Sequence, residues 1–156
     1  MQRIKASDLP VPTESEEQQS LFRYCSVEMS RYPELDMLAH IPNEGKRTKT
    51  NGAQLKREGL RKGYPDIVLN VSRNIFHGLF IELKRRSGSK IIREQKEWII
   101  KLNKQGYAAA FCYGWEEAWK FIHAYLTCEK STKAESVVKF YISRSLQEAA
   151  ESDTAR

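Results

Sequence analysis

Hydrophobic residues recur with a helical period in several parts of the chain. Leu21, Cys25 and Met29 are spaced four residues apart, and either Thr13 or Ser15 can cap the helix that this spacing predicts. The same spacing predicts further helices along the chain, and a basic stretch ended by glycine predicts the helix at residues 51–61. The predicted helices cover residues 14–32, 51–61, 93–105 and 116–126, and a last, peripheral helix follows residue 129.

Other segments favour strands. Residues 66–71 and 78–84 are rich in aliphatic and β-branched side chains and flank a turn, so we expect them to pair as a hairpin. Residues 107–113 form a nearly uninterrupted run of small and aromatic residues, which is typical of a buried strand. A short strand is expected within residues 35–41. This order of elements predicts an α/β fold with a mixed β-sheet flanked by helices.

The length of 156 residues suits one ordinary domain with a tail. We expect an extended N-terminal arm at residues 1–13, the main domain at residues 14–128, and the peripheral helix and tail at residues 129–156. No run of residues is apolar enough for a membrane helix, and the first residues contain no signal-peptide core. We therefore expect a cytoplasmic protein without a membrane partner.

Cysteine and histidine give little support for a zinc site or a Ser/His/Asp triad. The cysteines lie far apart in apolar surroundings, as buried thiols do, and no CxxC pair occurs. The histidines are equally scattered, so either kind of site could be assembled only by assuming the fold. The residues concerned are Cys25, Cys112 and Cys128, and His40, His77 and His123.

Positive charge is concentrated around the predicted hairpin. The chain has a formal net charge of +6, and the release of counterions from a phosphate backbone favours the binding of clustered Lys and Arg. Basic clusters at residues 46–49, 56–62 and 84–93 all flank the hairpin. Any one of them could be a solvated surface, but their joint position favours an anionic partner such as nucleic acid.

Asp66, Glu82 and Lys84 are the candidate catalytic residues. Alternate residues of a strand share a face, so Glu82 and Lys84 project together while Leu83 faces the core. Hairpin pairing can bring Asp66 to the same end of the sheet. Carboxylate oxygens suit Mg²⁺ or Mn²⁺, which polarise a phosphate and acidify a bound water, and the backbone carbonyl of Leu83 could add a ligand. Lys84 could then orient that water and stabilise developing charge. The alternative is an exposed Glu–Lys ion pair, with Asp66 as a turn residue after Pro65.

A long ordered series of short motifs surrounds these residues. It consists of Pro42-Asn43-Glu44-Gly45-Lys46-Arg47, Gly59, Gly63-Tyr64-Pro65-Asp66, Gly78-Leu79-Phe80-Ile81-Glu82-Leu83-Lys84, Glu94-Gln95, Gln105-Gly106-Tyr107 and Gly114-Trp115-Glu116-Glu117-Ala118. The series resembles the VRR-NUC family of the PD-(D/E)XK nuclease superfamily, in the compact stand-alone form found in bacteriophages, which would act in the cytoplasm of a bacterial host. The resemblance covers about residues 14–126.

The resemblance implies a Mg²⁺- or Mn²⁺-dependent DNA endonuclease that favours branched DNA such as four-way (Holliday) junctions. It implies an acidic residue near the metal from the first helix, for which Glu17 is the best match and Glu14 the competitor. It also places Gln95 near Lys84. The residues expected to contact DNA are Asn43, Lys46, Arg47, Lys49, Arg85 and Arg86. One departure is Glu44-Gly45, which adds a negative charge where relatives often carry a Gly-Gly pair.

Other functions compete with the nuclease. A non-catalytic DNA-binding module is disfavoured because the catalytic triplet is intact, and a protein interaction adaptor does not explain the triplet. A homodimer is the economical assembly, since symmetric cutting of two strands needs two active sites. Phe121, Tyr125 and Tyr141 could form the dimer surface or simply pack in the core.

Overall fold

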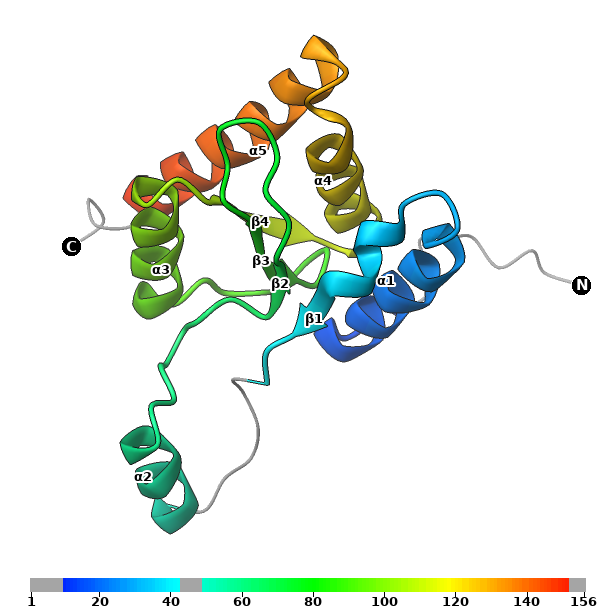
Figure 1. The fold of residues 1–156 in the computed structure, drawn as a ribbon. Helices are drawn as coiled ribbons and strands as arrows, with labels where there is room; N and C mark the ends of the chain where they lie inside the picture. Colours follow the sequence, from blue (N-terminus) through cyan, green and yellow to red (C-terminus); the bar gives the residue numbers. More distant parts are fainter. Residues whose placement is uncertain (1–9, 43–48, 152–156) are drawn as a thin grey trace, which may run out of the picture.

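A computed structural model describes residues 10–42 and 49–151 of the chain. Helices surround one four-stranded β-sheet (Figure 1). The helices are α1 (Glu14–Glu28), the 3-10 helix η2 (Pro33–Met37), α2 (Lys49–Arg57), α3 (Arg93–Lys104), α4 (Trp115–Thr127) and α5 (Thr132–Glu151). The strands are β1 (Leu38–His40), β2 (Ile67–Leu69), β3 (Leu79–Lys84) and β4 (Ala108–Tyr113). No described helix has the length and apolar character needed to cross a membrane.

The sheet is mixed, as the sequence predicts. Its order is β1-β2-β3-β4, with antiparallel pairing up to β3 and parallel pairing between β3 and β4. Ile67 lies opposite Ile81 in the predicted hairpin, and Lys84 lies beside Tyr113. Parallel strands need a long crossover, which α3 supplies here.

The two faces of the sheet carry separate hydrophobic clusters. Leu79, Ile81 and Leu83 belong to the larger cluster, on the side of α1 and α4. Phe80 belongs to the smaller cluster, on the side of α3. Because side chains alternate along a strand, Glu82 shares the α3 side with Phe80, and Lys84 does so as well.

Element boundaries differ from the sequence prediction where local geometry overrides periodicity. Thr13 is the cap of α1, because its hydroxyl accepts from the Glu16 amide at 3.2 Å while the Glu16 carboxylate accepts from the Thr13 amide at 2.7 Å. Helix α2 ends at Arg57, since Gly59 at φ 103° turns the chain. The segment 35–41 contains the end of η2 before a strand of three residues, because Pro33 starts a helical turn.

Helix α5 is part of the core, although the sequence suggests a peripheral helix. It packs against α3, α4 and β4, and it buries Val138, Tyr141, Ser145 and Ala149. One face of α5 thus covers the edge strand. Phe121 and Tyr125 of α4 are also fully buried, so these aromatic residues and Tyr141 pack inside the protein and do not form an exposed dimer surface.

Candidate active site

Asp66 and Leu83 meet where β2 begins. Ile67 and Ile81 are the last partners of the antiparallel pair, so the chain before Ile67 passes the end of β3. There, Asp66 Oδ2 accepts a hydrogen bond from the Leu83 amide at 3.0 Å. The side chain of Asp66 thereby replaces the strand partner that Leu83 lacks on the β2 side, and it is held at the end of the sheet.

Glu82 and Lys84 form a buried ion pair on the neighbouring strand. Lys84 Nζ lies 3.0 Å from Glu82 Oε1, and their side chains are only 5% and 3% exposed. The side-chain amide of Gln95 donates to the same Glu82 oxygen, and Gln95 Oε1 accepts from the Ile92 amide at 3.0 Å. Buried charges need this kind of pairing and hydrogen bonding. The start of α3 therefore holds Glu82 in place.

Several carboxylates act on the ammonium group of Lys84. Burial disfavours its charged form, but the negative charges of Glu82, Glu14 and Asp66 outweigh burial and raise the pKa of Lys84 above its usual value. Lys84 is thus a buried cation among acidic groups. Such a cation can stabilise a negatively charged substrate group.

Glu14 is the residue of α1 that reaches Lys84. Its Oε1 lies 3.9 Å from Lys84 Nζ and accepts a hydrogen bond from Ser89 Oγ at 2.9 Å. The Ser89 hydroxyl in turn accepts from the Arg85 amide at 3.1 Å. The loop after β3 therefore orients Glu14 beside the buried pair.

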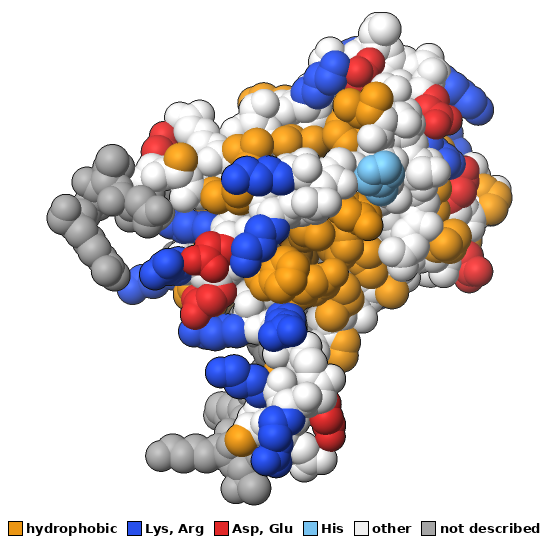
Figure 2. Space-filling model, turned by 60° about the vertical axis from the view of Figure 1, so that its left-hand side comes forward, with side chains coloured by type: hydrophobic (Ala, Val, Ile, Leu, Met, Phe, Trp, Pro, Cys, Tyr) orange, Lys and Arg blue, Asp and Glu red, His pale blue; other side chains and the backbone are white. Residues whose placement is uncertain are grey.

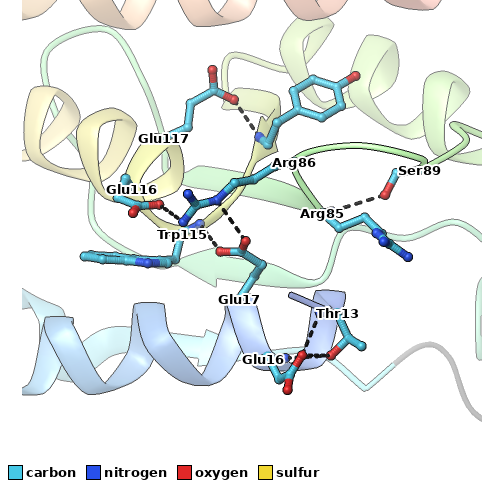
Figure 3. Close-up of polar contacts among 10 residues, drawn as sticks. Thr13, Glu16, Glu17, Arg85, Arg86, Ser89, Trp115, Glu116 and Glu117 are labelled. Carbon is cyan, nitrogen blue, oxygen red and sulfur yellow. Dashed lines mark hydrogen bonds and ion pairs between the residues drawn. The ribbon is translucent and has the colours of Figure 1, made fainter. Parts of the chain in front are cut away.

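Glu17 lies in a different network (Figure 3). Its fully buried carboxylate meets Arg86 Nε at 3.1 Å through Oε1 and accepts from the Trp115 amide at 2.8 Å through Oε2. Arg86 also reaches Glu116, at 2.6 Å. Glu17 thus joins α1 to the N-terminus of α4. Of the two acidic residues that the sequence leaves open, the structure brings Glu14, and not Glu17, to Lys84.

The donor set suits a hard divalent cation with few protein ligands. The described residues contain no group of three or more His, Cys, Asp or Glu side chains arranged around a metal position. Asp66, immediately before β2, and Glu82, on β3, provide two carboxylates. Lys84 O accepts from Gly114 N on the β4 side, so the Leu83 carbonyl points the other way, toward Asp66. Mg²⁺ usually keeps several waters and needs only one or two carboxylates. The residues therefore fit Mg²⁺ or Mn²⁺.

The structure places the residues expected to contact DNA in different environments, and some of them lie outside the described part of the chain. Asn43, Lys46 and Arg47 lie outside the described residues, and Lys49 is described only as the first backbone position of α2. Arg86 is half exposed but bound by two carboxylates. Arg85 is partly buried, and its Nε makes no hydrogen bond within the described part of the chain.

Gly63 is a residue whose structural role the sequence does not reveal. Its φ is +74°, and a Cβ at this position would lie 2.6 Å from the backbone carbon of Glu94 and 2.7 Å from the amide nitrogen of Gln95. Gly63 thus lets the segment leading to Asp66 touch the start of α3. Ser89, which orients Glu14, carries no sequence signal at all.

Comparisons with known proteins agree with this arrangement. A family model described as "VRR-NUC domain" matches residues 13–116. A solved structure titled "VRR_NUC domain protein" is similar at 31% sequence identity with a TM-score of 0.65, over 75% of this chain and 90% of that chain. No curated protein matches. The mixed sheet with flanking helices is thus a PD-(D/E)XK-like fold. The chain belongs to the VRR-NUC family of nuclease domains.

Proposed function

We propose that this protein is a metal-dependent DNA endonuclease that hydrolyses phosphodiester bonds. The observation that carries the proposal is the buried Glu82–Lys84 pair, held by Gln95, with Asp66 at the end of the neighbouring strand. A buried ion pair is weak evidence for stability as such, because desolvation offsets much of its attraction. Its position beside Asp66 in a family of nuclease domains supports a catalytic role.

Each residue has a distinct task in this proposal. Asp66 and Glu82, with the Leu83 carbonyl, would hold Mg²⁺ or Mn²⁺, which supplies Lewis-acid polarisation and a more acidic water when bound. Lys84 directs its ammonium group at the phosphate and stabilises charge that develops on it. Gln95 keeps Glu82 Oε1 fixed.

Glu14 is the acidic residue of α1 in this proposal. It faces Lys84 from across the site, and Ser89 orients it. Its side chain is 40% exposed, so solvent and substrate can reach it. Glu17, whose two oxygens bind Arg86 and the Trp115 amide, instead supports the structure around the site.

Branched DNA, including four-way junctions, is the substrate class that we propose, and a homodimer is the assembly. Cutting two strands at related positions needs two active sites, which two copies related by a two-fold axis provide. Sedimentation equilibrium of the purified chain, alone and with a four-way junction, tests the assembly. A monomer in both conditions would exclude it.

The metal requirement tests the enzymatic function. We expect Mg²⁺ or Mn²⁺ to support cleavage of a labelled four-way junction, whereas Ca²⁺ supports binding with little turnover, because it tolerates looser coordination and acidifies its water less. Gel-shift and cleavage assays on the same junction and a linear duplex, with each metal or with EDTA, measure both steps.

Asp66→Asn is the matched control, since it keeps the shape of the side chain and removes its charge. Cleavage that survives EDTA, or that Asp66→Asn leaves undiminished, would falsify the proposed mechanism. Binding without cleavage of any substrate under any metal would identify a non-catalytic DNA-binding module.

A further inference from the structure

Helix α2 lies on a basic arm, residues 49–61, that projects from the end of the sheet at which the active site lies. The chain leaves the sheet at Ile41, whose amide donates to the Asp66 carbonyl at 2.7 Å, and it returns to the sheet at Asp66 itself. Helix α2 makes at most marginal contacts with the other elements and stands away from the body (Figure 1). DNA bound at Asp66 would therefore run beside the arm.

The charge of the arm is not compensated within the described part of the chain. Lys56, Arg57 and Arg61 are exposed, and none of them forms an ion pair with a described carboxylate. The one acidic residue of the arm, Glu58, accepts a hydrogen bond from Gln54 at 2.9 Å. Uncompensated Lys and Arg side chains on a protruding element suit a phosphate backbone.

Aromatic side chains lie on the body near the arm. Tyr64 contacts Trp98, with ring centroids 4.6 Å apart, and Tyr64 and Tyr107 both contact Phe80, at 5.9 and 5.3 Å. Tyr64, Trp98 and Tyr107, which we call the aromatic hollow, are only partly buried. Figure 2, in which the side of α2 and α3 comes forward, shows hydrophobic side chains gathered in a hollow above the arm, with Lys and Arg on its left and below it.

The aromatic hollow adjoins the catalytic strand face. Phe80, which joins the rings, precedes Glu82 by two residues on the same face of β3, a distance of about 7 Å. Lys101 adds a cation, with its Nζ 5.4 Å from the Trp98 ring centroid. A strand of DNA at Glu82 is thus within about one or two nucleotides of aromatic rings and of cations.

We infer that the basic arm and the aromatic hollow together bind an unpaired strand of branched DNA next to the scissile phosphate. This inference rests on the proposed function and names the feature of the substrate that the site selects. Cations track the backbone and aromatic rings stack with bases, a combination that single-stranded DNA can use. A duplex cannot use the rings, because its base faces are already stacked.

A second copy of the chain is a poorer occupant of this surface. Two-fold contacts place the same patch of both copies together. Here that would bring the unpaired cations of both arms close to one another, and each chain already carries a formal net charge of +6. Like charges placed across an interface oppose association.

Binding measured in EDTA tests the inference without cleavage. The probes are a short duplex with a thymine tail that contains one 2-aminopurine, and the same duplex blunt-ended. For Lys56→Ala/Arg57→Ala/Arg61→Ala we expect the salt slope on the tailed probe to fall by about two units, for three lost phosphate contacts on a single strand. The control Lys130→Ala/Lys133→Ala removes two exposed cations around the start of α5 and should change nothing.

The aromatic hollow needs a test of its own. Tyr64→Leu/Tyr107→Leu should weaken binding of the tailed probe about tenfold, leave the blunt probe unchanged, and restore the 2-aminopurine fluorescence that stacking quenches. Tyr64→Phe/Tyr107→Phe keeps the rings and should behave as the wild type. Thermal unfolding of both variants shows whether they are folded.

The outcomes separate this inference from the nuclease proposal. If Tyr64→Leu/Tyr107→Leu lost equal affinity for the tailed and the blunt probes, the inference would be overturned. It would also be overturned if the wild type were a dimer that this variant converts to monomers, because a second copy would then cover the hollow. Neither result touches the nuclease proposal. If the wild type binds the tail as expected but cuts no DNA with any metal, the inference stands and the nuclease proposal fails.

Discussion

Glu82 and Lys84 depend on each other for both stability and the proposed catalysis. Lys84→Met alone leaves a buried carboxylate without its cation, and breaking a buried pair in this way costs about 3–5 kcal/mol. Glu82→Gln/Lys84→Met removes both charges and should recover most of that stability. Cleavage should still fall on the order of a hundredfold or more, because a metal ligand and a charge stabiliser are lost. Denaturant unfolding and cleavage assays measure the two effects.

The double variant should recover most of the stability, so its loss of cleavage can be measured in a folded protein. Lys104→Met, at an exposed position in the last turn of α3, is the matched control and should alter neither quantity. A folded double variant that cuts DNA at the wild-type rate would remove both residues from the mechanism.

Glu14 and Glu17 should respond to substitution in opposite ways. Glu14→Gln should lower cleavage about 10- to 100-fold, as for a group that supports a metal site, with little change in stability because its side chain is 40% exposed. Glu17→Gln should lower the free energy of unfolding by about 1–3 kcal/mol, because Arg86 loses the charge of its buried partner. The folded Glu17→Gln protein should cleave normally, and the reverse pattern would return the role to Glu17.

The sequence could not separate these two acids for a geometric reason. Residues three apart on a helix point to the same side, so Glu14 and Glu17 both face the body. Which of them meets Lys84 depends on Arg86 and Trp115, which come from distant segments. The face shared by Glu82 and Lys84 could be predicted, because the period of two is a property of the strand itself.

At the scale of elements, Gly63 joins the segment before β2 to the start of α3. Gly63→Ala combines a positive φ of +74° with a Cβ at 2.6 Å from the Glu94 backbone, so the segment and the helix must separate. We expect a loss of more than about 2 kcal/mol in unfolding free energy. We also expect a fall in cleavage, because Gln95 and Asp66 move apart.

Gly88→Ala is the matched control for backbone strain. Its φ is +75°, but no atom lies within 4 Å of the added Cβ. It should therefore show only the cost of the left-handed conformation, about 1–2 kcal/mol. Equal stability losses in both variants would mean that the contact between Gly63 and α3 has no role.

Edge strand β4 shows that hydrophobic periodicity does not predict the contacts between elements. Its outward backbone groups are satisfied by side chains: Asn103 bonds both the amide and the carbonyl of Ala109, and the Ser145 hydroxyl accepts from the Phe111 amide at 2.9 Å. This protects the edge from pairing with other strands. The buried strand was predictable from its apolar run. The burial of α5 was not, because polar Ser145 occupies one of its core positions.

At the scale of the whole molecule, the excess positive charge and the buried charged groups lie in different places. The excess of positive charge is carried by the surface, including the basic arm, whereas the paired acidic and basic groups of the active site lie inside. The sequence predicts the excess and its clustering near the hairpin. It does not reveal that one basic segment stands clear of the body, because a helix with few apolar residues has the same pattern whether it packs or projects.

Burial also sets how the stability of the whole fold depends on pH. Burial, with the nearby charge of Glu28, raises the pKa of the Cys25 thiol from 9.0 to about 12. Burial, with Glu117 and Cys112, raises the pKa of the Tyr141 phenol from 10.0 to about 12. A raised pKa means that the folded state holds the proton more tightly. The stabilisation is therefore complete below the pKa of the unfolded chain and is lost as the pH rises toward about 12.

We therefore expect the free energy of unfolding to fall above about pH 9. At pH 10, Cys25 alone should account for a loss of about 1.4 kcal/mol, because the unfolded thiol is mostly ionised while the folded thiol is not. Urea unfolding between pH 7 and pH 10 measures the change. Cys25→Ala removes this titration, so its stability, although lower at neutral pH because of the lost packing, should decline less steeply. An equally steep decline in both proteins would show that alkaline sensitivity arises elsewhere, and a flat profile in the wild type would mean that these buried groups ionise without opposing the fold.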